Sequence, residues 1–266
     1  MAKQRIHLTP AEAAAKGWLC QKHLRADRLM PGLHTRPAGS VWQGRGAYDV
    51  YDPAECVPWK WEPGPTQLRR QAVAARAQEL IGGDGLAVVL DTETTGVGHD
   101  AEICEITILD SKGTPLLDTL VRPTQPIPAE ATGIHRITDH MVATAPAWPE
   151  VADQYAAIVA GRTVVAYNAP FDQRLLAQTH QLHGLTAPEV TTACAMLLYA
   201  SWNGEWVEGR YGSSQWRWIK LAEAARECGV LEDGAHRAHA DARMTLGVLR
   251  YLQRRTNGRR PPRPKR

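Results

Sequence analysis

Several residue types are scarce in this 266-residue sequence, and each scarcity excludes a class of protein. Cysteine is scarce and odd in number, at Cys 5, and no two cysteines form a C-x-x-C pair. A disulfide framework is therefore not expected, whereas a reducing compartment is. No apolar run reaches the ~18 residues that span a membrane, and no signal-peptide core follows the first residues. We expect a cytoplasmic protein with no membrane contact.

Phenylalanine and lysine are also scarce, while tryptophan and arginine are frequent. The aromatic set is Phe 1, Tyr 7 and Trp 9, and arginine supplies 24 of the 31 basic residues. Arginine and tryptophan can bind phosphates and stack on bases, although a coding bias would give the same skew. The hydrophobic fraction of 44% and the charged fraction of 22% are ordinary, which argues against wholesale disorder and against a fibrous repeat.

The formal net charge of +3 conceals an uneven distribution along the chain. Residues 86–200 carry 13 acidic and 5 basic side chains, whereas residues 251–266 carry 7 basic and no acidic ones. The run 255–266 is too charged and too proline-rich to pack, so we expect a basic, disordered tail. Such a tail either adds salt-dependent affinity for phosphates or has no role.

The beginning of the chain differs in character from the rest. Residues 1–66 are irregular and spaced by proline and glycine, with one helix expected at about 10–30. Residues 67–81 have a helical composition and end at a glycine-rich turn, which predicts a domain boundary there. We expect residues 1–84 to form a small N-terminal appendage of unknown function, open to a protein partner, ahead of a larger domain at 85–254.

Residues 85–254 alternate between strand-like and helix-like segments. Three strands in succession suggest an antiparallel meander, and a later β-α-β-α alternation adds parallel strands after a proline-rich loop at 123–133. This order predicts an α/β fold with a mixed sheet flanked by helices. The strands are expected at 86–90, 102–109, 115–121, 163–167 and within 189–200, and the helices at 148–160, 170–182, 219–228 and 238–254.

Two carboxylates follow the first apolar strand directly. The strand leads into the run D-T-E-T-T-G, and strand alternation places Asp91 and Glu93 on one side. Like charges this close raise each other's pKa unless a cation neutralises them, and divalent ions with oxygen ligands are the usual solution. Turn or capping acids would give the same hexapeptide, so this motif alone leaves both interpretations open.

Two more acidic segments lie later in the chain. An apolar strand ends in Asn168, and Asp172 then falls in the first turn of a helix. Asp241 lies in the first turns of the last helix, five residues after His236. The helix dipole favours an acid at such positions, so each segment taken alone is explained as well by a helix start as by a metal site.

Together and in this order, the motifs D-x-E-T-T-G, N-A-x-F-D and H-x-x-x-x-D resemble the DnaQ-like, or DEDDh, 3′–5′ exonuclease superfamily over residues 86–254. The chain is similar to the proofreading-type exonuclease domain of DNA polymerase III epsilon subunits. The segment from Thr132 to Thr138 is similar to the family's I-H-G-I-T, with Arg136 in place of the usual glycine. The resemblance implies a ribonuclease-H-like fold that carries the N-terminal appendage and the basic tail as additions.

The resemblance also implies two Mg²⁺ or Mn²⁺ ions, whose charge four carboxylates balance during an in-line displacement at phosphorus. It assigns the general base to His236, whose neutral imidazole can accept a proton from the attacking water. His239 has the wrong offset for this role and is expected to be a surface or supporting residue. The implied metal ligands are Asp91, Glu93, Asp172 and Asp241.

The resemblance further implies a set of residues that contact the terminal nucleotide. Val97 stands at the position that wedges against the last base, but it is shorter than the Leu or Met common there. Phe171 could equally belong to the core, and His135 could equally be a hydrogen-bonded loop residue. The implied substrate-binding residues are Thr94, Thr95, Gly96, Val97, His135, Asn168 and Phe171.

A segment rich in tryptophan and arginine, residues 202–218, lies outside these motifs. Interleaved aromatic and basic side chains can hold single-stranded nucleic acid. The same tryptophans could instead pack against the N-terminal appendage. The sequence leaves both interpretations open.

The expected function is that of a metal-dependent exonuclease that releases nucleoside 5′-monophosphates from the 3′ end of nucleic acid. Single-stranded DNA is favoured over RNA, and proofreading and DNA repair both fit this activity. The alternatives are a 3′–5′ exoribonuclease and a non-catalytic nucleic-acid- or polymerase-binding module on the same fold. A non-catalytic module has no physical need for four mutually repelling carboxylates.

Overall fold

The computed structural model describes residues 6–32, 35–43, 46–58, 63–83, 86–208, 214–230, 234 and 236–259. The chain divides into two compact units, Met1–Pro63 and Gly64–Arg266. Helix α3 (Pro65–Ile81) belongs to the second unit because its apolar face, which includes Ala77 and Leu80, is buried in that unit's core. The boundary between the two units therefore lies before this helix, at Pro63. The sequence places it after the helix, near residue 84.

The first unit is a small α/β fold. Its sheet has the order β1-β4-β5-β2, and β3 pairs with β6 separately. The single helix expected at about 10–30 is instead two short helices, because Gly17 has a φ of +68° and the chain turns there. The elements are β1 (His7–Leu8), α1 (Pro10–Ala15), β2 (Leu19–Cys20), α2 (Gln21–Ala26), β3 (Leu29–Met30), β4 (Gly39–Gln43), β5 (Gly46–Tyr51), η1 (Pro53–Glu55) and β6 (Val57–Pro58).

The second unit is built on a five-stranded mixed sheet with the order β11-β10-β7-β8-β9. Strands β7, β8 and β9 form the expected antiparallel meander, and β10 and β11 run parallel to β7. The strand β7 is therefore central, with parallel pairing on one side and antiparallel pairing on the other. The strands are β7 (Ala87–Thr94), β8 (Ile103–Leu109), β9 (Pro115–Leu120), β10 (Thr163–Ala166) and β11 (Thr191–Cys194).

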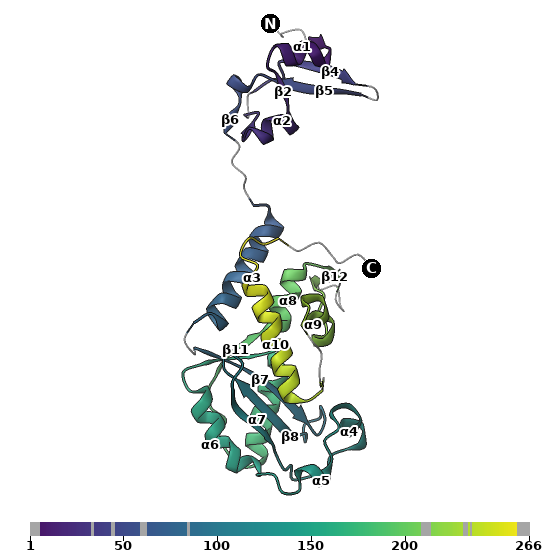
Figure 1. Cartoon of the computed structure of the whole chain (residues 1–266). Helices are drawn as coiled ribbons and strands as arrows, with labels where there is room; N and C mark the ends of the chain where they lie inside the picture. The colour runs from purple at the N-terminus through teal and green to yellow at the C-terminus, as the bar shows by residue number, and fades with distance from the viewer. Residues whose placement is uncertain are drawn as a thin grey trace. The chain divides into compact units, whose positions relative to one another are not determined.

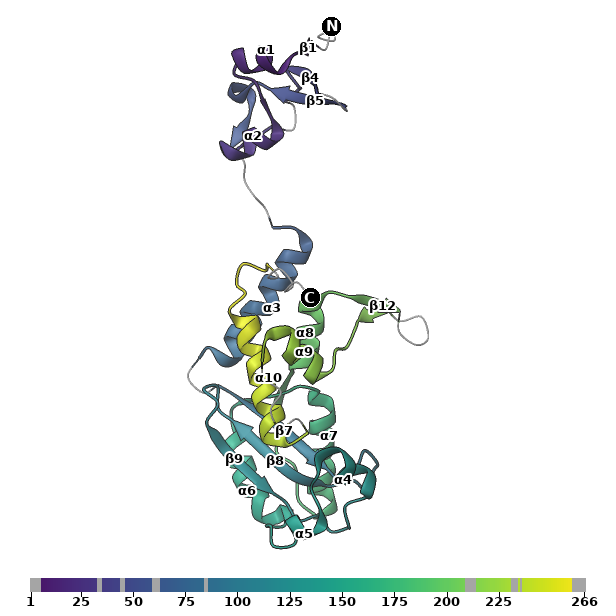
Figure 2. The ribbon, with the colours of Figure 1, turned by 45° about the vertical axis from the view of Figure 1, so that its right-hand side comes forward.

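Helices cover both faces of this sheet (Figures 1 and 2). Alternate residues of β7 enter two cores: Val88 and Leu90 pack with α6 and α7, whereas Ala87 and Val89 pack with α3, α8, α9 and α10. The mixed sheet flanked by helices is thus confirmed. The helices are α6 (Trp148–Val159), α7 (Ala169–Leu182), α8 (Ala195–Asn203), α9 (Leu221–Cys228) and α10 (Ala238–Gln253).

Two short helices, α4 (Ala129–His135) and α5 (Asp139–Val142), form a third small cluster beside the sheet. Helix α4 occupies the second half of the loop expected at 123–133, because Pro128 ends the extended segment and the alanines after it begin a helix. None of the helices in the described ranges is long and apolar enough to cross a bilayer.

The tryptophan-rich segment divides into a buried and an exposed part. Trp202 is 1% exposed in the core of its own unit, at the end of α8. The strands β12 (Trp206–Glu208) and β13 (Ser214–Trp216) then pair as a two-stranded ribbon. Of the tail expected from residue 255, residues 260–266 lie outside the described residues. The part that precedes them is packed, since Gln67 Nε2 donates to Asn257 O at 2.6 Å.

Candidate active site

Three carboxylates meet where β7 approaches the start of α10. Asp91 and Glu93 alternate with the buried Leu90 and Thr92, so they share the face of the sheet that α10 covers. Asp241 lies in the first turn of α10. One carboxylate oxygen from each of the three residues lies within 4.8 Å of the other two. The strand end and the helix start, which are far apart in the sequence, thus converge on one acidic cluster.

Asp172 reaches the cluster from the other face of the sheet. It stands in the first turn of α7, which packs on the opposite face from α10, and it is 6% exposed. Thr92 Oγ1 donates a hydrogen bond of 2.8 Å to Asp172 Oδ1. Because Thr92 sits between Asp91 and Glu93, this bond ties the fourth carboxylate to the strand that carries the first two.

Burial raises the pKa of every carboxyl in the cluster, and repulsion from other carboxylates of the cluster adds to the shift at Asp91 and Glu93. Burial is the first cause at Asp91, whose pKa lies well above its usual value, and the charges of Asp172 and Asp241 add to it. Burial and then Asp241 raise the pKa of Glu93 to about 8. Burial raises the pKa of Asp172 to about 7, although the hydrogen bond from Thr92 opposes the shift.

Asp241 behaves in the same way as its neighbours. Burial raises its pKa, and the backbone N–H of His236, which donates to Asp241 Oδ1 at 3.2 Å, partly opposes the shift. Four carboxylates that resist ionisation together suit hard divalent cations, which take oxygen ligands and favour the charged forms. The donor set of the cluster therefore fits the metal ions that the sequence predicts.

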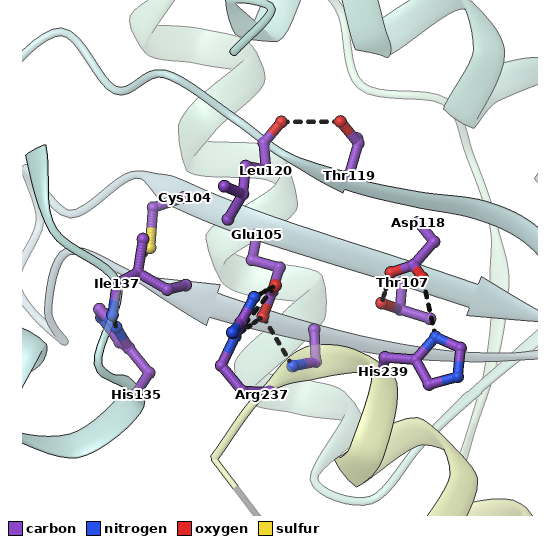
Figure 3. Close-up of polar contacts among 11 residues, drawn as sticks. Cys104, Glu105, Thr107, Asp118, Thr119, Leu120, His135, Ile137, Arg237 and His239 are labelled. Atoms are coloured by element: carbon purple, nitrogen blue, oxygen red, sulfur yellow. Dashed lines mark hydrogen bonds and ion pairs between the residues drawn. The ribbon is translucent and has the colours of Figure 1, made fainter. Parts of the chain in front are cut away.

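An ion pair between a buried glutamate and a partly exposed arginine supports the cluster and was not predicted from the sequence (Figure 3). Glu105 of β8 stands opposite Glu93 and is 5% exposed. Arg237 Nε lies 3.1 Å from both carboxylate oxygens of Glu105, and its Nη2 also donates to Oε1. Glu105 Oε2 accepts the backbone N–H of Ala238 at 2.9 Å. Glu105 thus fixes the first residue of α10 and the residue before it.

His236 lies on the chain just before this ion pair. Its side chain is exposed, and its φ of +63° is a left-handed conformation that costs most residues of order 1–3 kcal/mol. The bond from its N–H to Asp241 and the anchor of its neighbour Arg237 fix the backbone on both sides. His236 therefore lies next to Asp241, with its side chain exposed to solvent.

His239 belongs to a separate network (Figure 3). Its Nδ1 lies 2.8 Å from Asp118 Oδ2, and Thr107 Oγ1 donates to Asp118 Oδ1 at 2.7 Å. Asp118 is on β9, two strands away from β7. His239 therefore links α10 to the meander as a supporting residue.

The loop after β7 presents the expected substrate residues with different exposure. Thr94 and Thr95 are buried, and Thr94 Oγ1 donates to Gly96 O at 2.8 Å. Val97 is 76% exposed, so its apolar side chain is open to a ligand. Two hydrogen bonds fix the turn: the N–H of Thr95 donates to Glu102 O, and the N–H of Glu102 donates to Thr95 Oγ1.

Glu102 is a second buried acid that the sequence did not indicate. It is 1% exposed, and its Oε1 accepts both the N–H and the Oγ1 of Thr124, at 2.9 and 2.6 Å. Its Oε2 lies 3.2 Å from Nε2 of His183. Glu102 thus joins the turn at Thr95 to two other segments. A charged residue in an otherwise apolar strand region was the available signal for Glu102, as it was for Glu105.

His135 is buried, with both ring nitrogens engaged inside the protein. Its Nδ1 accepts the N–H of Ile137 at 3.0 Å, which leaves Nε2 protonated to donate to Thr94 O at 3.2 Å. Burial lowers its pKa, in keeping with a neutral ring. Arg136 beside it has a φ of +63°, so the chain keeps here the left-handed turn that glycine adopts easily. His135, the last residue of α4, is thus a buried residue whose hydrogen bonds link this helix to the end of β7.

Asn168 and Phe171 stand at the start of α7, on the same side as Asp172. Asn168 is exposed and its side chain makes no capping bond, so its amide is free among the described residues. Phe171 is half-buried, and the guanidinium of Arg174 lies 5.4 Å from its ring centre. Asn168 is therefore open to solvent, whereas Phe171 packs in part against the core that includes α6 and α7.

The sheet order, the acid-bearing strand and the two acid-bearing helices together define a nuclease of the DnaQ-like type. The chain matches the family model described as exonuclease, RNase_T, over residues 88–249, which is more than half of its length. It belongs to this exonuclease family. The enzyme is a phosphodiester hydrolase, and the 3′–5′ direction is that of the DnaQ-like family.

Two curated relatives and one solved structure illustrate the likeness. The uncharacterized exonuclease CP81 of Escherichia phage 186 is 46% identical over 192 residues, which are 70% of this chain and 96% of that protein. The DNA polymerase III subunit epsilon of Treponema pallidum is 31% identical over 167 residues, which are 60% of this chain and 72% of that protein. The similarity to epsilon subunits is confirmed.

The solved structure is the zinc-bound complex of E. coli exonuclease I with single-stranded DNA. It has a TM-score of 0.54 and 14% identity, and the match covers 65% of this chain and 41% of that one. At this identity the likeness concerns the fold, and it confirms the ribonuclease-H-like arrangement.

Proposed function

We propose that the chain is a metal-dependent 3′–5′ exonuclease that releases nucleoside 5′-monophosphates and prefers DNA to RNA. The observation that carries the proposal is the convergence of Asp91, Glu93 and Asp241 within 4.8 Å, with Asp172 tied to the same strand. A non-catalytic scaffold gains nothing from four carboxyls whose pKa values are all raised.

Asp91, Glu93, Asp172 and Asp241 would hold two Mg²⁺ or Mn²⁺ ions, which when bound offset the negative charge of the phosphodiester and activate water. The elements β7, α7 and α10 fix the backbone positions of the four carboxylates, so the negative charges of the site have a defined arrangement. His236 accepts the proton of the attacking water from its exposed position beside Asp241.

The terminal nucleotide is placed by the residues around the cluster. Val97 offers an exposed apolar contact to the last base, and Asn168 offers an exposed amide at the start of α7. His135 acts indirectly in this account, since its bond to Thr94 O holds the end of β7. The preference for DNA is supported by the relative that is a DNA polymerase III subunit.

The substrate class is tested by digesting matched single-stranded DNA, duplex DNA and RNA, all labelled at the 5′ end, in Mg²⁺ and in Mn²⁺. The proposal expects single-stranded DNA to be shortened fastest. RNA degraded faster than DNA of the same sequence would identify a 3′–5′ exoribonuclease instead. Where a carboxylate of the cluster is changed to its amide in the same assay, Asp153→Asn is the matched control, because it removes one exposed charge on α6.

A further inference from the structure

The ribbon β12–β13 lies apart from the sheet that carries the carboxylates. Trp206 pairs with Trp216 across the two strands, and neither strand joins the five-stranded sheet. Figure 2 shows the ribbon projecting away from α8 and α9. An isolated two-stranded ribbon is only marginally stable in water, so side chains must hold this one in place.

A stack of three side chains provides that support. The indoles of Trp206 and Trp216 meet edge to face, with their centroids 4.5 Å apart and their planes at 80°. The guanidinium of Arg69 lies 4.4 Å from the Trp216 ring centre. Arg69 comes from α3 and is fixed by a 2.9 Å hydrogen bond from its Nε to Ser201 O. Trp216 is thus held from both sides, and Trp206 forms the outer end of the stack.

The outer end of this stack is open to solvent. Trp206 and Trp218 are each 57% exposed, although tryptophan is highly buried on average. Arg217 between the strands and Trp218 is neutralised locally, because it pairs with Glu205 at 2.7 Å and with Glu223 at 3.1 Å. Two large indoles, Trp206 on the ribbon and Trp218 just after it, are therefore displayed beside an arginine whose charge is paired.

Positive charge surrounds the base of the ribbon. Arg69 Nε donates to the backbone carbonyl of Ser201, a bond that leaves the charge of its guanidinium unpaired, and Arg70 Nε donates to the carbonyl of Trp202. The chain after α10 packs on the first turn of α3, since Gln67 Nε2 donates to Asn257 O, and Arg254 and Arg255 lie just before this contact in the chain. This end complements a polyanion, whereas the carboxylates occupy the opposite end of α10.

We propose that the ribbon is a second nucleic-acid site, where a base of the single strand upstream of the 3′ end stacks on Trp206. Arg69 and the arginines beside it bind the neighbouring phosphates. Asp241 and Arg254 are about 20 Å apart along α10 at 1.5 Å per residue. The ribbon lies toward the Arg254 end of the unit, so it engages single strands long enough to extend from the acidic cluster to that end and releases them as they shorten.

The inference goes beyond the proposed function, because the ribbon is separate from the carboxylates, and it rests on that function only in taking nucleic acid as the ligand. It is tested by fluorescence anisotropy on the full chain carrying Asp91→Asn, with fluorescein-labelled dT20 and dT4. Trp206→Ala should weaken dT20 binding about fivefold or more and leave dT4 binding unchanged. Trp206→Phe should retain most of the affinity.

Trp42→Ala is the matched control, since Trp42 is 66% exposed in the other unit. Unchanged dT20 affinity in Trp206→Ala, or an equal loss in Trp42→Ala, would overturn the inference. An equal loss with dT4 would do so as well. If Trp206→Ala lowers the melting temperature, Trp206→Leu, which keeps an apolar side chain but removes the aromatic face, gives the same test. A wild-type chain that binds dT20 but cleaves nothing would instead refute the proposed function alone.

Discussion

Arg237 Nε lies 3.1 Å from both carboxylate oxygens of Glu105, and this contact joins the start of α10 to strand β8 of the sheet. The two residues are 132 positions apart in the sequence, and their contact fixes the backbone between His236 and Ala238. The carboxylate of Asp241 and the side chain of His236 therefore take their positions from a pair that does not itself belong to the acidic cluster.

Removing Arg237 should destabilise the protein and slow the reaction. Arg237→Ala leaves the buried Glu105 without its main partner, which costs about 1–3 kcal/mol in the free energy of unfolding. The same change in a Glu105→Ala background should lower the free energy of unfolding by less. Chemical denaturation of the wild type, the two single variants and the double variant measures the difference. Arg76→Ala, which breaks an exposed pair with Glu79, is the control and should cost about 1 kcal/mol or less.

The raised pKa values predict how metal ions and pH act together. A carboxyl with a raised folded-state pKa stabilises the fold at low pH and loses this effect as pH rises through the folded value. Glu93 and Asp172, with pKa values of about 8 and about 7, place that loss between about pH 4 and 8. In EDTA the melting temperature should therefore fall from pH 5.5 to pH 8.5.

Magnesium should reverse this fall, because cation binding favours the ionised carboxylates. The rise in melting temperature on adding Mg²⁺ should be larger at pH 8.5 than at pH 5.5, as measured by differential scanning fluorimetry. Glu93→Gln should flatten both the pH dependence and the response to Mg²⁺. A Mg²⁺ effect of equal size at both pH values would contradict this reading of the cluster.

The two histidines near α10 should differ in their effect on turnover. His236→Ala should lower kcat by about 100-fold or more, the usual contribution of a general base, with a smaller effect on KM. His239→Ala removes an exposed pair with Asp118 and should leave kcat close to that of the wild type. Steady-state kinetics on one oligonucleotide compares them. A larger loss of kcat in His239→Ala would transfer the role of base to that residue.

Val97 should affect substrate binding more than the fold. Its side chain is 76% exposed, so Val97→Leu adds one methylene toward the substrate and should lower KM about fourfold, at about 0.8 kcal/mol per buried CH₂. The kcat should change little. Leu86→Ala is the control, because Leu86 is 69% exposed and stands just before β7, whereas Val97 follows the strand. Equal KM values in Val97→Leu and Val97→Ser would remove Val97 from the substrate site.

The carboxylates could be located from the sequence because their signals are local. Asp91 and Glu93 follow an apolar strand directly, and Asp172 and Asp241 stand at helix starts. Each position depends only on nearby residues, and the family motifs supply the order. The mixed sheet follows from the same local alternation of strands and helices.

The supporting contacts could not be predicted, because they join distant segments. Nothing near Glu105 in the sequence indicates Arg237, and nothing near Thr92 indicates that its hydroxyl serves Asp172. The boundary before α3 was missed for the same reason, since that helix is assigned by packing in the second unit's core and the glycines after it look like a linker. The ribbon β12–β13 was missed because the pairing of Trp206 with Trp216 depends on the opposite strand.

The most direct test follows a 5′-labelled single-stranded oligonucleotide over time, with the wild type and Asp91→Asn compared in Mg²⁺. The account predicts a ladder of products shortened one nucleotide at a time from the 3′ end. In Asp91→Asn the rate should fall at least about 100-fold, since even residues that support metal ligands cost 10–100-fold when changed. Release of the label as a mononucleotide at the earliest times, or an undiminished ladder with Asp91→Asn, would contradict it.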